Sequence, residues 1–447
     1  PPAAELTAEA FDHMIFPLIP YADVKEHGPR IFVEGEGLRL IDANGKTYLD
    51  MMSSHTRANA LGYGNEEIAA SVYEQLRNLH YVGTVANLTE PAIELATKIA
   101  SLAPEPLERV LFVSGGSEAV ESAIKLAKQY QIGSGNKPRA YKVISRWNAY
   151  HGATMGAMGA TDWLGIRHIN EPGAVGYSFI PGPMNYRNPF GMETGAYMAF
   201  CAEYLEQQIL HEGPELVAAF IAEPVMQANG VQVTPPSYFQ RVREICDKYG
   251  VVWIDDEVIT GFGRTGNWFA IERPGVAPDI MTFAKALTAG YMPMGGIIAR
   301  PEIADSMPIF RHVHTFSGHA GAAAAASAAI RIMERDRLVE KVRTDGVYFL
   351  NALTRELEPL PIVGEVRGAG FWVAIDFTSD KRSKAAFSDD TVKAVAARMA
   401  EDGVLASAIG TAIEMAPPYV ATRSDLDHTV EVAARAIREI SKERGLA

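Results

Sequence analysis

The chain has 447 residues, of which 48% are hydrophobic and 21% charged, and its formal net charge is −13. This length suffices for two or three lobes with a large core, and the composition is typical of a globular enzyme. The negative charge repels phosphodiester backbones and anionic lipid, so we expect neither nucleic acid nor a membrane as the main partner. Two cysteines, Cys201 and Cys246, are too few for a disulfide framework, which favours a cytoplasmic location.

The first lobe, residues 1–75, mixes turn residues with short alternating runs. Residues 31–33 and 38–42 are predicted strands, and Asn44-Gly45 between Ile41 and Tyr48 indicates a hairpin. We expect this N-terminal segment to pack against the C-terminal domain.

The middle of the chain, residues 76–334, alternates apolar strands with amphipathic helices. Helices are predicted over 117–130 and 237–249, the second ended by Gly250. The predicted strands cover 110–113, 142–144, 217–225, 251–254 and 280–283. This order predicts an α/β fold with a mainly parallel sheet covered by helices.

The last part, residues 335–447, has the pattern of a smaller α+β domain. Helices are predicted near 338–358, 389–402 and 424–443, and strands at 365–367 and 371–377. The three predicted units therefore have their boundaries at 75/76 and 334/335.

A glycine-rich turn, Ser114 to Glu118, lies between a predicted strand and a predicted helix. Glycine there lets the backbone approach an anion, and the helix N-terminus offers unpaired N–H groups together with the Ser117 hydroxyl. A phosphate would fit at Gly116 and Ser117. An ordinary N-cap with a tight turn explains the same residues about as well, because glycine loops are weak motifs.

Three acids, Asp255, Asp256 and Glu257, close an apolar strand. Carboxylates at the carboxyl end of a parallel strand lie where α/β sheets bind ligands. One of them could hold a metal, act as acid or base, or pair with a cationic ring. For Asp255 and Glu257 we favour capping of a helix or loop.

Lys285 directly follows another predicted strand and is flanked by apolar residues. Burial would lower its pKa and favour bond formation with a carbonyl carbon. Taken alone, a lysine reaching to the surface is the more frequent explanation.

Tyr150 and His151 follow a fourth predicted strand and could cover a planar ligand, although loop packing is an alternative. His312 and His314 have no matching ligand cluster, so we expect no metal.

Together the four motifs supply an anion site, a stacking partner, an acid for a pyridine nitrogen and an amine for an aldehyde. Pyridoxal 5′-phosphate needs this set of groups.

At this point the sequence resembles the class III (omega-type) aminotransferases, which are fold type I pyridoxal-phosphate enzymes. The resemblance runs from Phe16-Pro17 to Pro417-Pro418 and is most specific over Ile254 to Gly266 and Pro278 to Leu287. Supporting stretches are Ser117-Glu118-Ala119, Tyr150-His151-Gly152, Ala222-Glu223-Pro224-Val225 and Thr315-Phe316-Ser317-Gly318-His319.

The resemblance implies a role for each matching residue. Lys285 would form the Schiff base with the cofactor and act as general base, and Asp256 would pair with the pyridine nitrogen. Val258 and Tyr150 would contact the two ring faces. Gly116 and Ser117 would bind the phosphate, joined by Thr315 of a second subunit, and Glu223 would be an electrostatic acid nearby. A homodimer with shared active sites is thus implied, with a tetramer as a further possibility.

The sequence departs from the family in the substrate pocket. Members that accept keto acids often carry an arginine shortly before the Pro-Pro pair, but none occurs between Gly403 and Pro418, and Arg423 follows the prolines. Arg57 falls where omega-type enzymes place an aromatic residue, and it could bind a carboxylate or sulfonate. A surface ion pair is the alternative for Arg57. Val85 and Ala86 replace bulkier residues and suggest a roomier substrate pocket, whereas Gln227 replaces a smaller one.

We therefore expect an aminotransferase that moves an amino group from a primary amine or omega-amino acid to a small keto acid such as pyruvate. An aminomutase, racemase or decarboxylase on the same scaffold is the first alternative, since Lys285 and Asp256 serve all of them. A non-catalytic cofactor-binding protein is the second. A nucleotide-binding α/β protein is the third, and the lack of a standard nucleotide loop disfavours it.

Overall fold

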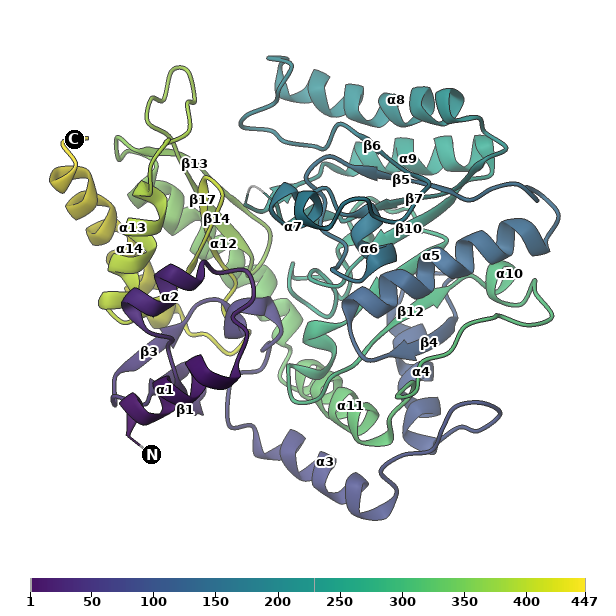
Figure 1. The fold of residues 1–447 in the computed structure, drawn as a ribbon, viewed down its shortest axis with the longest axis horizontal. Helices are drawn as coiled ribbons and strands as arrows, with labels where there is room; N and C mark the ends of the chain where they lie inside the picture. Colours follow the sequence, from purple (N-terminus) through teal and green to yellow (C-terminus); the bar gives the residue numbers. More distant parts are fainter. Residues whose placement is uncertain (1, 229, 447) are drawn as a thin grey trace.

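The computed structural model describes residues 2–228 and 230–446 and divides into a large and a small half (Figure 1). The large half is built on a seven-stranded sheet, and the small half contains both chain termini (Figure 1). In the described ranges, no helix is long and apolar enough to cross a bilayer.

The strand order of the large sheet is β4-β12-β11-β10-β7-β5-β6. Its pairings are parallel except at β12, which is antiparallel to both β11 and β4. The mainly parallel sheet is as predicted, but β6 and β12 were not predicted. The strands are β4 (Arg109–Val113), β5 (Lys142–Arg146), β6 (Tyr177–Ile180), β7 (Val217–Ala222), β10 (Val252–Asp256), β11 (Ile280–Phe283) and β12 (Gly295–Ala299).

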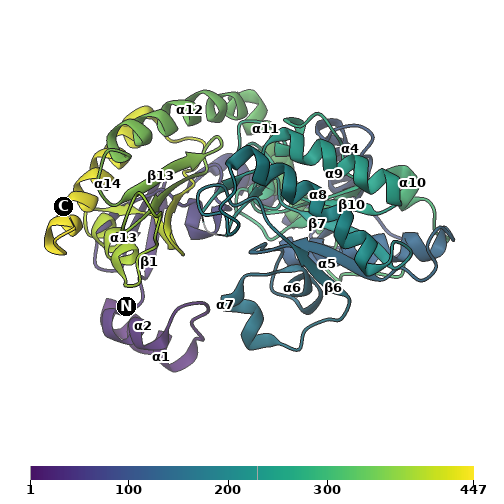
Figure 2. The same cartoon turned by 90° about the horizontal axis from the view of Figure 1, so that it is seen from above.

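Helices cover both faces of this sheet (Figure 2). On one face lie α5 (Gly116–Gly133) and α6 (Met155–Ala160). On the other lie α4 (Glu90–Leu102), α8 (Thr194–Glu212), α9 (Pro236–Tyr249) and α11 (Ala320–Arg335), with α3 (Glu66–Asn78) packed on α11. Of the shorter helices, α10 (Pro301–Ala304) lies near the right edge of Figure 1, and α7 (Leu164–Arg167) lies at the lower edge of Figure 2.

The central strand β10 shows why both faces are apolar. Val252 and Ile254 belong to the core beneath α5, whereas Trp253 stacks on Phe239 of α9 with ring centroids 5.5 Å apart. Because side chains alternate along a strand, Asp256 continues the face of Val252 and Ile254. The acid therefore emerges on the side where α5 begins.

The small half combines the two ends of the chain. One sheet has the order β1-β2-β3-β15 and joins β1 (Phe32–Glu36), β2 (Arg39–Asp42) and β3 (Thr47–Asp50) to β15 (Val404–Leu405). The other has the order β13-β14-β17-β16, built from β13 (Val363–Gly368), β14 (Val373–Phe377), β16 (Ser407–Ile409) and β17 (Ala412–Met415). The helices here are α1 (Ala3–His13), α2 (Tyr21–His27), α12 (Leu338–Leu357), α13 (Thr391–Glu401) and α14 (Arg423–Glu443).

Several expectations are refined by the structure. The predicted strand 217–225 breaks at Glu223 and Pro224, after which β8 (Val225–Met226) pairs with β9 (Gln232–Val233) as a separate hairpin. The strands β15, β16 and β17 were not predicted. The predicted boundary at residue 75 falls inside α3 and that at residue 334 near the end of α11, so this division into domains stays a prediction.

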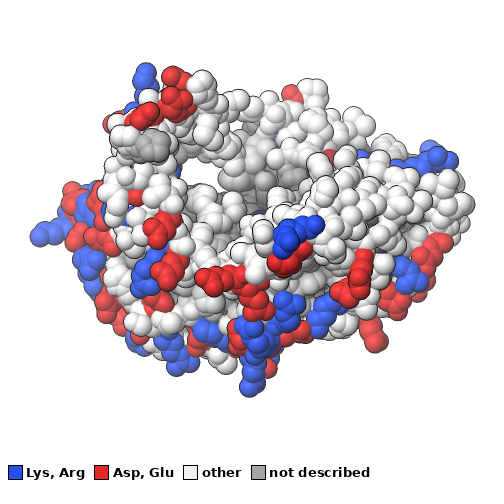
Figure 3. Space-filling view, turned by 90° about the horizontal axis from the view of Figure 1, so that it is seen from below, with Lys and Arg blue, Asp and Glu red and all other residues white. Residues whose placement is uncertain are grey.

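The surface carries charges of both signs. In Figure 3, Lys and Arg lie interspersed with Asp and Glu around the rim of the molecule, and a hollow between the two halves is bordered mainly by uncharged side chains. On the face drawn in Figure 3, the described residues therefore form no extended basic patch of the kind that binds polyanions.

Candidate active site

Of the eight cofactor-site residues that the family resemblance implies, seven line one cavity of about 170 Å³, together with His151. They come from loops at the carboxyl ends of the central strands and from the start of α5. The seven are Gly116, Ser117, Tyr150, Glu223, Asp256, Val258 and Lys285. Ligands of open α/β sheets bind at this edge.

Lys285 follows β11 and is half-buried in the cavity wall. Burial and the positive charge of Arg57 lower the pKa of its amine to about 8. The residue has φ 47°, a conformation that costs a non-glycine residue about 1–3 kcal/mol and is often found at functional sites. The amine is thus predisposed to act as a nucleophile and base near neutral pH.

Asp256 ends β10 and is 5% exposed. Its Oδ1 accepts hydrogen bonds from Thr282 Oγ1 at 3.0 Å and from the Val258 amide at 3.1 Å. Its Oδ2 lies 2.6 Å from Nδ1 of His151. These contacts fix the orientation of the carboxylate at the cavity wall.

His151 was expected to help cover a planar ligand, but in the structure its ring contacts Asp256. Its ring is buried, Nδ1 contacts Asp256, and Nε2 is buried without a partner in the described part of the chain. Thr282, the cross-strand neighbour of Asp256 on β11, was missed. The sequence signal for Thr282 was its place three residues before Lys285 on a strand adjacent to Asp256.

The other two acids of the triplet are fully buried. Glu257 accepts hydrogen bonds from Thr260 Oγ1 and the Ile271 amide, which agrees with the expected loop capping. Burial raises its pKa to about 7. Asp255 caps nothing among the described residues, contrary to expectation, and burial beside Glu257 raises its pKa well above the usual range.

Glu223 and Tyr150, which also line the cavity, are joined by a hydrogen bond. The Tyr150 amide donates to Glu223 Oε1 at 2.8 Å, and the Tyr150 ring meets Trp163 edge-on at a centroid distance of 5.8 Å. Burial raises the pKa of Glu223. Gln227 is buried next to Glu223 but is not one of the cavity-lining residues.

The N-terminus of α5 is open toward the cavity. Among the residues that the structure describes, no side chain caps it, and Gly115 before it is fully extended, with φ −177°. Close packing surrounds this turn: a Cβ on Gly152 would lie 2.5 Å from Ser117 Oγ, and one on Gly116 would lie 2.7 Å from Val258 Cγ1. Unpaired N–H groups and the helix dipole favour an anion here.

Arg57 is buried rather than on the surface, so the surface ion pair considered above is wrong. The turn Ser53–Arg57 carries it inward, and Ser53, Ser54, His55 and Arg57 all have positive φ between 47° and 65°. Its Nη2 donates to Glu414 Oε2 at 2.5 Å. Its positive charge lowers the pKa of Lys285 and partly offsets the rise that burial causes in the pKa of Tyr150.

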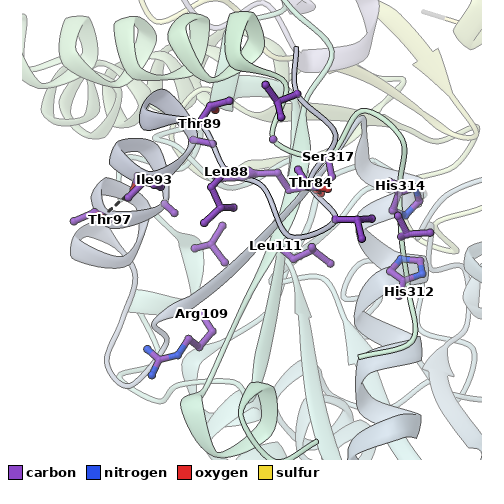
Figure 4. Close-up of a pocket in the computed structure, with 18 of the residues that line it drawn as sticks. Thr84, Leu88, Thr89, Ile93, Thr97, Arg109, Leu111, His312, His314 and Ser317 are labelled. Atoms are coloured by element: carbon purple, nitrogen blue, oxygen red, sulfur yellow. Dashed lines mark hydrogen bonds between the residues drawn. The ribbon is translucent and has the colours of Figure 1, made fainter. Parts of the chain in front are cut away.

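Val85 and Thr315 do not reach this cavity within one chain. Both are exposed, and Val85 borders a separate cavity of about 740 Å³. Figure 4 shows that second cavity between α4, β4 and the segment containing His312 and His314. Ala86 is also exposed. Arg423 pairs with Asp345 at 2.9 Å at the start of α14 and is not one of the cavity-lining residues.

Comparison with known proteins decides the family. A family model described as aminotransferase class-III matches residues 21–437. The chain belongs to the class-III aminotransferases. A relative from Pseudomonas aeruginosa, named putrescine–pyruvate aminotransferase, is 36% identical over 444 residues, which cover 97% of this chain and 96% of that one.

Solved structures agree with this class-III assignment. An (S)-enantioselective omega-transaminase from Thermomicrobium roseum has a TM-score of 0.94 and 38% identity, covering 98% of this chain and 99% of its own. An omega-transaminase from Pseudomonas jessenii in complex with PMP has a TM-score of 0.94 and 33% identity, covering 99% of each chain. The predicted fold type I and the predicted cofactor, pyridoxal phosphate, are thereby confirmed.

The residues of this class-III aminotransferase fit its cofactor. The uncapped start of α5 suits a phosphate, Asp256 suits a protonated ring nitrogen, and Lys285 suits an aldehyde. In the described ranges, no group of three His, Cys, Asp or Glu residues could hold a metal ion.

Proposed function

We propose that this aminotransferase moves the amino group of a primary amine or an omega-amino acid to a small keto acid such as pyruvate at the cavity of Lys285 and Asp256. The observation that carries the proposal is that Lys285 and Asp256 line the same cavity. The pKa of Lys285 is lowered to about 8. Three polar contacts hold the Asp256 carboxylate in one orientation. The name of the Pseudomonas aeruginosa relative gives pyruvate as its acceptor.

Bound pyridoxal phosphate supplies an electrophilic aldehyde and a ring that withdraws electrons. Lys285 would hold the cofactor through its amine, and the same amine would remove and return a proton of the substrate. The low pKa matters because a useful fraction of the amine is then neutral near pH 7.

The remaining cavity residues position the reaction. Asp256, aligned by His151 and Thr282, would keep the ring nitrogen protonated through a charge-assisted bond. Tyr150 and Val258 would contact the ring faces, Gly116 and Ser117 would hold the phosphate, and Glu223 would fix the Tyr150 loop.

We also propose a homodimer with shared active sites. The cavity of Figure 4 is bordered by exposed apolar side chains, among them Val85 (75% exposed), Leu88 (71%) and Val313 (66%). A contiguous apolar surface of this kind favours coverage by another protein surface. A second copy of this chain is the occupant that would carry Val85 and Thr315 to the neighbouring active site. The proposal extends to a tetramer formed by two such dimers.

A cytoplasmic location stays part of the proposal. Cys201 and Cys246 are both buried and free, as is usual in a reducing compartment.

The test is to follow the two half-reactions separately by the visible absorbance of the bound cofactor. A panel of amines and amino acids without acceptor should contain one donor that converts the cofactor to its amino form, and pyruvate should then restore the original spectrum. A spectrum that no donor changes, or a product other than the carbonyl of the donor, would favour a mutase, racemase or decarboxylase.

A further inference from the structure

The hairpin of β8 and β9 follows β7 of the large sheet but packs against the small half. Its residues Val225 and Val231 share a buried apolar cluster with four residues of the small half, Trp372, Ala374, Ala412 and Ala416. At the turn of the hairpin Gly230 has φ +73°, and a Cβ there would lie 2.5 Å from the Cβ of Ala412 on β17 and 3.3 Å from that of Ala374 on β14. The backbone of the turn therefore lies directly on the small-half sheet.

A buried carboxylate of the small half holds this turn and a second segment. Arg367 on β13 donates from Nε to the Gly230 carbonyl oxygen at 2.6 Å and from Nη2 to Asp376 Oδ2 on β14 at 2.7 Å. The side chains of Arg367 and Asp376 are 8% and 3% exposed. The other oxygen, Asp376 Oδ1, accepts from Nη1 of Arg187, which lies in the loop between β6 and α8. Asp376 thus links two segments of the large half to the small half.

Three further hydrogen bonds connect the hairpin turn to the wall of the active-site cavity. The Gly230 amide donates to the Gln227 carbonyl oxygen at 3.1 Å, and the Gln227 amide donates to Glu223 Oε2 at 3.3 Å. Glu223 Oε1 accepts from the Tyr150 amide at 2.8 Å. Glu223, Val225 and Tyr150 all line the cavity. Because close-packed interiors transmit displacements, a shift of the turn would reach these lining residues.

We propose that Asp376 is a positioning residue for the transamination. Through Arg367 it fixes the hairpin, and through the hairpin it fixes Glu223 and the Tyr150 ring at the face of the cofactor ring. Asp376 is not one of the described residues that line the cavity, so it acts on the reaction through these contacts. The inference rests on the proposed function, in which Tyr150 contacts the ring, and it makes the position of the small half a determinant of the reaction geometry.

The chemistry of Asp376 suits a junction of this kind. A carboxylate accepts hydrogen bonds at both oxygens, whereas an amide of the same shape has one acceptor oxygen. Asp376→Asn therefore loses one of its two arginines and keeps the volume of the side chain. Arg367 retains Glu365 as a partner at 2.7 Å, so the substitution does not leave this guanidinium without an acid, and we expect the variant to fold.

The experiment compares Asp376→Asn, Tyr150→Ala and the double variant with the unmodified holoenzyme. One readout is the circular dichroism of bound pyridoxal phosphate, which reports the surroundings of its ring without turnover. The other is a single-turnover rate, in which protein loaded with pyridoxamine phosphate is mixed with pyruvate and the cofactor absorbance is followed. Asp345→Asn is the matched control, because Asp345 is a buried acid of the small half whose cationic partners, Lys341 and Arg423, lie on α12 and α14.

We expect Asp376→Asn to alter the circular dichroism band and to slow the pyruvate half-reaction by about ten- to a hundredfold, since a misplacement of about 1 Å can cost that much. The rate of the double variant should match that of Tyr150→Ala within about twofold, because residues that act through one path do not have additive effects. Asp345→Asn should leave both readouts unchanged. If Asp376→Asn does not fold, Arg367→Lys takes its place, since it keeps the charge but lacks the planar fork that reaches Gly230 and Asp376 together.

An unchanged circular dichroism band in Asp376→Asn, or losses that add in the double variant, would reduce Asp376 to a structural residue and overturn the inference. Equal losses in Asp345→Asn would have the same meaning. If the unmodified protein loaded with pyridoxamine phosphate does not react with pyruvate, the proposed function has failed, and the circular dichroism still decides whether Asp376 positions the ring surroundings.

Discussion

Nδ1 of His151 lies 2.6 Å from Oδ2 of Asp256, and both side chains are buried. Thr282 and the Val258 amide occupy the other oxygen, so the carboxylate has little freedom to rotate. We predict that Asp256→Asn keeps the cofactor but slows the amine half-reaction by about a hundredfold or more, because an amide cannot stabilise a protonated ring nitrogen. Near-normal turnover of Asp256→Asn would show that Asp256 does not stabilise the protonated ring nitrogen.

His151→Asn should have a smaller effect of the same kind, about tenfold on the half-reaction rate, because Asp256 keeps its charge but loses one orienting partner. The measurement is the single-turnover rate with a fixed donor, with Thr282→Val as the companion variant. A larger loss for His151→Asn than for Asp256→Asn would mean that the imidazole acts on the substrate directly.

The pKa of Lys285 predicts a pH dependence. Burial and Arg57 lower it to about 8, so the neutral amine predominates only above that pH. In the cofactor-free protein, the rate at which added pyridoxal phosphate bonds to Lys285 should rise with pH and level off above about 8. In Arg57→Met the repelling charge is gone, so the pKa should rise and the profile should move to higher pH. A profile unchanged by this substitution would contradict the electrostatic coupling.

Gly152 has φ +125°, and a Cβ there would lie 2.5 Å from Ser117 Oγ. Gly152→Ala should therefore push Ser117 away from the phosphate position and weaken cofactor affinity by about tenfold or more, the value of one lost hydrogen bond to a charged group. Gly135→Ala is the control, because Gly135 also has positive φ, +74°, with nothing within 4 Å of the added Cβ. Equal effects on cofactor dissociation would assign the loss to backbone strain alone.

The proposed dimer can be tested at the cavity of Figure 4. Leu88→Asp places a charge on its apolar border, where Leu88 is 71% exposed in a single chain. We expect sedimentation to show a shift toward monomer together with loss of transamination, because Thr315 would no longer reach the other site. Ile169→Asp, at an even more exposed apolar residue (86%) that does not border the cavity, should remain dimeric. A monomeric wild type with full activity would refute the shared site.

Part of the site could be predicted because apolar residues recur at regular spacing along the strands and helices that carry it. Strand β10 and the start of α5 have clear periodicity, so the sequence alone places Asp256, Gly116 and Ser117 at one sheet edge. Lys285 and Asp256 are expected together for the same reason, since both lie at the ends of neighbouring strands.

What was missed depends on contacts distant in sequence. Glu414 lies on a short strand, β17, with no strong pattern, and its partner is 357 residues away. The inward path of Arg57 depends on four residues with positive φ, none of which is glycine, so no sequence signal indicated the turn. Thr282 could be recognised as a partner of Asp256 only from the register of β10 against β11, which the sequence does not give.

The central claim is that Lys285 bonds the cofactor, and reductive trapping tests it most directly. The holoenzyme would be treated with borohydride, digested, and its peptides mapped by mass spectrometry, alongside Lys285→Ala. The cofactor mass should appear on the peptide containing Lys285 and vanish, together with transamination, in the variant. A cofactor fixed to a different lysine, or a Lys285→Ala protein that still transaminates, would contradict the account.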